Sequence, residues 1–93
     1  MPKVVLKGYI LVDDADLTAV QDELENHIQL TRQEEGCLVF DVSRDEKDKN
    51  RFNVYEEFIN QEAFELHQER VRNSLWGKIS ENVERYYQIT HES

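Results

Sequence analysis

The chain has 93 residues, of which 39% are hydrophobic, and its 11 Lys and Arg against 20 Asp and Glu give a formal net charge of −9. One domain spanning residues 1–93 is expected, because chains of this length fall below the usual size for two cores. The negative charge repels nucleic-acid phosphates and anionic membrane surfaces, so the sequence predicts neither as a partner and favours a small neutral or apolar ligand.

The cysteine count and the hydropathy pattern indicate a soluble cytoplasmic protein. Cys37 is the only cysteine, so no internal disulfide can form, which fits a reducing compartment. Lys7 interrupts the apolar run near the amino end, and no window approaches eighteen apolar residues.

Residues 3–12 are rich in Val, Ile, Leu and Tyr and end at two aspartates, which predicts a strand closed by a polar turn. A helix is predicted next, with Asp16 as its amino cap and Gly36 as its stop. Its inward residues recur every three or four positions: Leu17, Val20, Leu24, Ile28 and Thr31.

Two antiparallel strands are predicted over residues 37–43 and 51–58, joined by the polar turn 44–50. In the first strand the alternating row is Leu38, Phe40 and Val42. In the second strand Glu56 shares a face with Phe52, Val54 and Phe58, because successive side chains point to opposite sides. Glu56 is therefore the one carboxylate in an apolar row.

Asn60 is predicted to cap a second helix whose inward stripe contains His67. The stripe consists of Ala63, Phe64, His67 and Val71, and it continues past a break near residues 72–74 as Leu75, Trp76, Ile79 and Val83. Residues 83–90 alternate again and predict a last strand.

The predicted order is strand, helix, strand, strand, helix, strand, which is the α+β arrangement of ferredoxin-like (βαββαβ) domains, with one antiparallel sheet and helices on one face. The first and last strands carry apolar or aromatic side chains on both sides. The free sheet face is then too apolar for a monomer, so a second subunit is expected to cover it.

Three segments resemble the antibiotic biosynthesis monooxygenase (ABM) family in this order and at these spacings: residues 27–42 (HIQLTRQEEGCLVFDV), 52–56 (FNVYE) and 63–67 (AFELH). The resemblance covers nearly the whole chain. It implies a homodimer built as a dimeric α+β barrel, with an apolar pocket between sheet and helices. It also implies oxidation of polycyclic phenols or hydroquinones by O₂ without metal or flavin. The EEGCLVFDV segment is also similar to the branch that processes a phosphorylated autoinducer-2 signal, so a small-carbonyl isomerase is an alternative.

Two departures from the family pattern bear on the site. Many members carry a second histidine a few residues past the one matched by His67, and here Arg72 stands nearest to that place, as a candidate for substrate binding. Relatives that degrade haem have a tryptophan where His67 falls and a haem-ligating histidine where this chain has Trp76 and Gly77. Haem binding is therefore not expected.

His67 and Glu56 are the candidate catalytic pair. An imidazole titrates near neutrality, so His67 could take a phenolic proton and leave the anion that reacts with O₂, with Glu56 orienting the ring or binding substrate hydroxyls. The alternative for His67 is a core histidine bonded to backbone. The alternative for Glu56 is a structural ion pair with an arginine, because an unpaired buried carboxylate is costly. The candidate arginines are Arg32, Arg70 and Arg72.

Four aromatic residues are candidates for a flat substrate slot, with ordinary core packing as the alternative: Trp76, Phe40, Phe64 and Tyr86. His27 is expected at the surface or boundary, and His91 in a tail. No metal site is expected, because His27 and His67 belong to different helices without a third ligand at suitable spacing. Cys37 is expected to be a buried inert thiol.

The sequence thus predicts a cofactor-independent monooxygenase for a small aromatic or quinol substrate. A ligand-binding or stress-response dimer of the same fold without turnover is the alternative.

Overall fold

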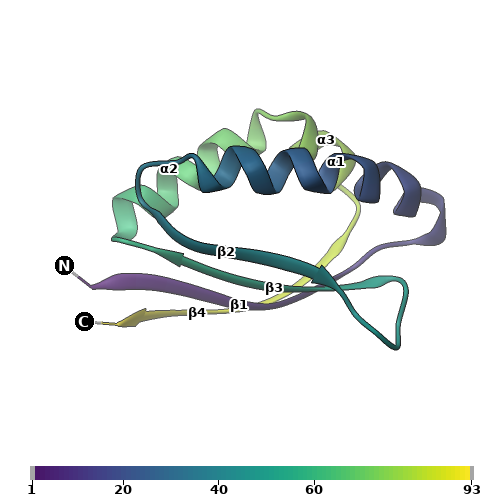
Figure 1. Cartoon of the computed structure of the whole chain (residues 1–93), viewed down its shortest axis with the longest axis horizontal. Coiled ribbons are helices and arrows are strands. Elements are labelled where there is room, and N and C mark those ends of the chain that lie inside the picture. Colours follow the sequence, from purple (N-terminus) through teal and green to yellow (C-terminus); the bar gives the residue numbers. More distant parts are fainter. Residues whose placement is uncertain (1, 93) are drawn as a thin grey trace.

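The alternating and helical patterns form one antiparallel sheet with its helices on one side (Figure 1). In this computed structural model, which describes residues 2–92, the elements are β1 (Lys3–Leu11), α1 (Asp14–Arg32), β2 (Cys37–Arg44), β3 (Arg51–Phe58), α2 (Gln61–Arg72), α3 (Leu75–Ile79) and β4 (Glu84–Glu92). The strand order is β2-β3-β1-β4, and every neighbouring pair is antiparallel. The predicted ferredoxin-like α+β fold is confirmed, with α3 as a short helix after the expected break.

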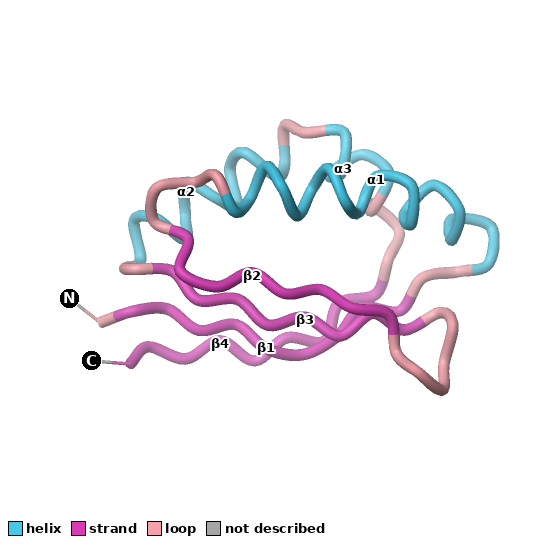
Figure 2. The backbone as a smooth tube through the Cα atoms, viewed as in Figure 1, coloured by secondary structure: helices cyan, strands magenta, loops and turns pink. Residues whose placement is uncertain are grey.

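The core lies between the helices and one face of the sheet. α1 packs over β2, and α2 packs over β1 and β3, so the helices all lie on one side of the sheet (Figure 2). The buried residues come from every layer: Val4, Leu6, Ile10, Val12, Val20, Phe52, Val54, Phe58, Phe64, Trp76 and Val83. Tyr87 and Ile89 share the helix side of β4, which is an edge strand, and are 38% and 46% exposed.

The sequence predicted the amino cap of α2 correctly but not the ends of α1. Asn60 caps α2 as predicted, since its Oδ1 accepts a hydrogen bond from the backbone N–H of Ala63 at 2.8 Å. α1 instead begins at Asp14, before the expected cap Asp16, and ends at Arg32. Gly36 is not the residue that stops α1. It directly precedes β2 and lies beside α2, where a Cβ at position 36 would lie 2.3 Å from the Cβ of Ala63.

A β-bulge breaks the predicted alternating row of Leu38, Phe40 and Val42 on β2. The pairing with β3 shifts between Cys37 and Val39, so Leu38 leaves the row of Phe40 and Val42. Leu38 is 52% exposed, whereas Phe40 is buried.

The face of the sheet away from the helices mixes aromatic and charged side chains. Tyr9 stacks on Tyr86 with ring centroids 5.0 Å apart, and the guanidinium of Arg51 lies 3.8 Å from the Tyr9 ring centroid. Lys3 and Glu57 form an ion pair at 2.8 Å. This face is more polar than the sequence pattern indicated. Within residues 2–92, no helix has the length and apolarity to cross a membrane.

Candidate functional site

His67 and Glu56 meet in the interior between α2 and the sheet. Glu56 lies on β3 between Phe40 of β2 and Leu6 of β1, on the side that faces the helices. The side chain of His67 projects from α2 toward the same space, and its Nε2 is 3.9 Å from Oε1 of Glu56. Both residues are buried, at 4% and 6% exposure. The two periodicities thus place the two side chains together, as the sequence indicated.

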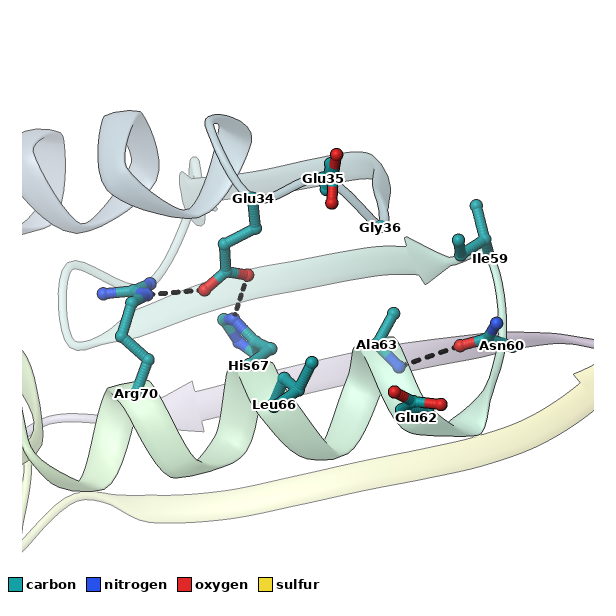
Figure 3. Close-up of a pocket in the computed structure, with 10 residues that line it drawn as sticks. All are labelled: Glu34, Glu35, Gly36, Ile59, Asn60, Glu62, Ala63, Leu66, His67 and Arg70. Carbon is teal, nitrogen blue, oxygen red and sulfur yellow. Dashed lines mark hydrogen bonds and ion pairs between the residues drawn. The ribbon is translucent and has the colours of Figure 1, made fainter.

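The closest polar partner of His67 is Glu34, in the connection between α1 and β2 (Figure 3). Nδ1 of His67 lies 2.8 Å from Oε1 of Glu34. The other oxygen of Glu34 accepts a hydrogen bond from Nε of Arg70, one turn further along α2. Nη2 of Arg70 also donates to Oγ1 of Thr31 at 2.9 Å. Glu34, His67 and Arg70 therefore form one bonded cluster that joins α2 to the end of α1.

Burial decides the charge state of the catalytic candidates. Desolvation raises the pKa of Glu56 to about 8, and the negative charge of Glu34 adds to the increase. Desolvation also lowers the pKa of His67, although the charge and hydrogen bond of Glu34 oppose that change. Near pH 7 Glu56 is mostly protonated and His67 neutral. The 3.9 Å approach between them is then a contact of neutral groups, too long for a hydrogen bond.

A pocket of about 450 Å³ opens beside this cluster, between the α1–β2 connection and α2. Its volume falls within the usual range for small-molecule sites. His67, Glu34 and Arg70 form its polar side, and Ile59, Ala63 and Leu66 its apolar side (Figure 3). The remaining lining residues are Glu35, Gly36, Asn60 and Glu62.

His27 is buried, which corrects the expected surface or boundary position. It is 5% exposed and stacks on Trp76, with ring centroids 4.5 Å apart and planes 4° from parallel. Position 27 lies one turn before buried Thr31, so it belongs to the inward face of α1. Its Nδ1 has no hydrogen-bond partner among residues 2–92, and burial lowers the pKa of His27 to about 3, with His67 and Arg70 adding to the effect.

The predicted aromatic slot is only partly assembled. The ring of Phe40 lies 5.7 Å from that of His67, and Phe64 packs on Phe58 at 5.6 Å. Trp76 reaches His67 only through His27. Tyr86 does not join them, because it stacks on Tyr9 on the face of the sheet away from the helices. None of the four predicted aromatic residues lines the pocket.

The arginines also differ from expectation. Arg72 is exposed at the end of α2, away from His67, and the arginine that reaches the cluster is Arg70. None of the three arginines considered as partners of Glu56 bonds to it, since Arg32 binds the Phe40 carbonyl and Asp41, and Arg70 binds Glu34.

Glu34 was missed by the sequence reasoning. A signal existed, because residue 34 lies three positions beyond Thr31 and extends the inward stripe of α1 past the helix end. Arg70 similarly lies three residues after His67 on the same side of α2.

The remaining candidates, Cys37 and His91, do not line the pocket. Cys37 is half-buried rather than buried, and desolvation raises the pKa of its thiol to about 11, with Glu34 and Glu56 contributing, so the thiol stays protonated. His91 lies in β4, where its Nε2 is 2.8 Å from Oε1 of Gln61. Across residues 2–92, no three His, Cys, Asp or Glu side chains are grouped closely enough to hold a metal ion.

Comparison with known proteins places the chain in a family. The sequence profile described as antibiotic biosynthesis monooxygenase matches residues 4–72. The fold is similar to a crystal structure of an antibiotic biosynthesis monooxygenase, with a TM-score of 0.76, 22% identity, and coverage of 100% of this chain and 97% of the other. A Deinococcus radiodurans protein assigned provisionally to the same activity has 26% identity and a TM-score of 0.74, with 97% and 90% of the two chains covered.

A conserved protein from Methanosarcina mazei is similar as well, with a TM-score of 0.74, 17% identity, and coverage of 98% and 91% of the two chains. A search among curated proteins finds no significant match.

Proposed function

Because the chain belongs to the antibiotic biosynthesis monooxygenase family, we propose that it is a cofactor-independent monooxygenase that oxidises a small neutral quinol with O₂ at the pocket beside His67. The observation that carries the proposal is a buried neutral imidazole that lines the pocket and whose Nε2 makes no hydrogen bond within residues 2–92. Such a nitrogen can accept a proton from a bound hydroxyl group.

The chemistry begins with a proton transfer. A substrate hydroxyl gives its proton to Nε2 of His67, and the electron pair of the O–H bond stays on the oxygen. The resulting phenolate delocalises this charge into the ring, which is then electron-rich enough to react with O₂. One oxygen atom then enters the ring and the other leaves as water, so a hydroquinone and O₂ give a hydroxyquinone and water without a further reductant. Ile59, Ala63 and Leu66, on the apolar side of the pocket, offer an apolar surface to the ring of the substrate.

The charge of the pocket favours neutral substrates over phosphorylated ones. Three glutamates line it, Glu34, Glu35 and Glu62, and its only cationic lining residue, Arg70, is already paired with Glu34. A phosphate would meet uncompensated negative charge there. The quinol proposal is therefore preferred to the isomerase that processes a phosphorylated signal.

A non-catalytic ligand-binding dimer is the second candidate. It is favoured by Arg72, which stands near the place of the second histidine of many family members but is exposed and does not line the pocket. The two candidates share the pocket and differ only in turnover. For both, we propose a cytoplasmic homodimer.

Oxygen uptake tests the proposal. We expect the wild-type protein to consume O₂ above the non-enzymatic rate with at least one member of a panel of neutral hydroquinones and naphthohydroquinones. His67→Ala should return uptake to the non-enzymatic rate. His91→Ala, which removes an exposed histidine outside the pocket, is the matched control and should retain activity. Binding without uptake by the wild-type protein would establish the second candidate instead, and equal uptake by His67→Ala would remove His67 as the base.

A further inference from the structure

The cluster around Glu34 uses both oxygens of one carboxylate. Oε1 faces Nδ1 of His67 at 2.8 Å, and Oε2 accepts from Nε of Arg70. The Glu34 side chain is 19% exposed and that of His67 is 4% exposed, so the contact between them is largely shielded from water. A carboxylate held at both oxygens has little freedom to turn.

The guanidinium defines the charge state of Glu34. Arginine stays protonated in proteins and donates only, so the carboxyl group paired with Arg70 is favoured as the ionised, accepting form. Both of its oxygens then accept, and Nδ1 of His67 must carry the hydrogen in the bond to Oε1. A neutral imidazole has one N–H, so Nε2 is left with a free lone pair.

Arg70 is itself held by α1. Its Nη2 donates to Oγ1 of Thr31, which is completely buried and donates its own hydrogen to the His27 carbonyl at 2.8 Å. A chain of hydrogen bonds therefore runs from the α1 backbone through Thr31, Arg70 and Glu34 to His67. The orientation of the imidazole is set by two helices rather than by α2 alone.

The groups on the other side of His67 agree with this assignment. Glu56, on β3, is the polar group nearest Nε2, and at 3.9 Å it is too distant to orient the ring. The other titratable group facing His67 is His27 on α1, with 6.2 Å between ring centroids. Neither supplies an acceptor that competes with Glu34 for the ring hydrogen.

We propose that Glu34, clamped by Arg70, is the positioning residue of this site: it fixes His67 as the Nδ1–H tautomer and so leaves the Nε2 lone pair for a substrate hydroxyl. This role replaces the orienting role first considered for Glu56. Its catalytic consequence rests on the proposed monooxygenase function, whereas the tautomer itself is a property of the protein without substrate.

The tautomer is measured directly by ¹⁵N-detected correlations of the His67 ring above pH 7 in the substrate-free protein. We expect the Nδ1–H pattern in the wild-type protein. In Glu34→Ala the acceptor is gone, so the ring should move toward the Nε2–H form that free imidazole prefers. Glu34→Gln keeps the side-chain volume with one acceptor oxygen, and it should give an intermediate result and guard against misfolding of the alanine variant. Glu46→Ala is the matched control, since it removes an exposed glutamate in the turn between β2 and β3, outside the pocket.

Turnover provides the second measurement. With a quinol that the wild-type protein oxidises, Glu34→Ala should lower kcat by about tenfold or more, in the range of general-base effects, with little change in KM. Glu46→Ala, in the exposed turn between β2 and β3 and outside the pocket, should leave kcat unchanged.

The outcomes separate the two proposals. An Nε2–H tautomer in the wild-type protein, or an unchanged Nδ1–H tautomer in both Glu34 variants, refutes the role of Glu34. An altered tautomer with undiminished kcat refutes its catalytic consequence. If no quinol is oxidised by the wild-type protein, the monooxygenase proposal fails, and the ring measurement still decides the assignment of Glu34.

Discussion

Glu56 is a carboxyl group kept neutral by the fold, and this makes stability depend on pH. Its pKa is about 8 in the folded protein against an ordinary value of 4.5. Between these values the folded chain keeps a proton that the unfolded chain has released, so stability falls as pH rises through this window. Glu56→Gln keeps the shape without titrating. We expect the free energy of unfolding of Glu56→Gln, relative to that of the wild-type protein, to be higher at pH 8 than at pH 4.5 by about 2 kcal/mol or more. Urea unfolding at the two pH values measures this difference. Parallel stability profiles would contradict the raised pKa.

His27 gives the opposite dependence. Its pKa is about 3 in the folded protein against an ordinary value of 6.5, so stability is lost as pH falls through that range, where the unfolded chain takes up a proton first. His27→Phe keeps an aromatic ring for the stack on Trp76 and removes the unpaired Nδ1. We expect a gain of about 1 kcal/mol at pH 7 and about 2 kcal/mol more at pH 5, by urea unfolding.

The matched control for this variant is His91→Phe, which changes an exposed histidine. It should show no such gain on acidification. A His27→Phe variant that loses stability at both pH values would mean that the imidazole has a partner after all.

For individual residues, the sequence predicted contacts that follow from the period of one helix or strand. It missed contacts that depend on how a second element packs against the first. Glu56 and His67 each sit on an inward row, so both had to face the same interior. Alternation along β4 gave two rows without telling which row faces the helices, so Tyr86 was assigned to the wrong side. Glu34 lies beyond the last turn of α1, so it was missed, although it continues the spacing of the inward stripe three positions after Thr31.

Among the elements, the packing of the start of β2 against α2 requires that residue 36 has no side chain. The backbone of Gly36 lies against α2, and Ile59 donates its N–H to the Gly36 carbonyl at 2.9 Å. A Cβ at residue 36 would come within 2.3 Å of the Cβ of Ala63, so α2 would have to move away. We expect Gly36→Ala to lower the free energy of unfolding by about 1–3 kcal/mol, as overpacking does elsewhere.

The double variant Gly36→Ala/Ala63→Gly checks the cause. Removing the Ala63 methyl group relieves the contact, although glycine in a helix costs about 1 kcal/mol. The double variant should therefore lose less stability than the sum of the two single variants, and urea unfolding of all four proteins measures the difference. Additive losses would show that the contact is not what constrains residue 36.

Element types were predictable because each follows from a local period and a local cap. Asn60 marks the start of α2 through one side-chain hydrogen bond within the same turn. The bulge at Leu38 was not predictable in this way, because it arises from the pairing of β2 with β3, which the pattern of β2 alone does not contain.

For the molecule as a whole, one face of the sheet is left without helices. The helices cover only one side, and the other carries Tyr9, Tyr55 and Tyr86, the last of which is 47% exposed. Some of the charges on this face are already paired within the chain, as in the Lys3–Glu57 ion pair. A partner that covered this ion pair would therefore bury neither charge without its counterion.

We therefore expect a homodimer whose sheets face each other, with twice the chain mass by light scattering. Tyr86→Lys places a charge in that interface and should give monomers, because an unpaired charge cannot be buried cheaply. Leu75→Lys is the matched control, since Leu75 is a 61% exposed apolar residue on α3, away from the sheet, and should leave the dimer intact. Each chain has a formal charge of −9, so association opposes electrostatic repulsion and should strengthen as salt concentration rises. A wild-type monomer at micromolar concentration and high salt would rule out the dimer, and dissociation by Leu75→Lys but not by Tyr86→Lys would move the interface to the helical side.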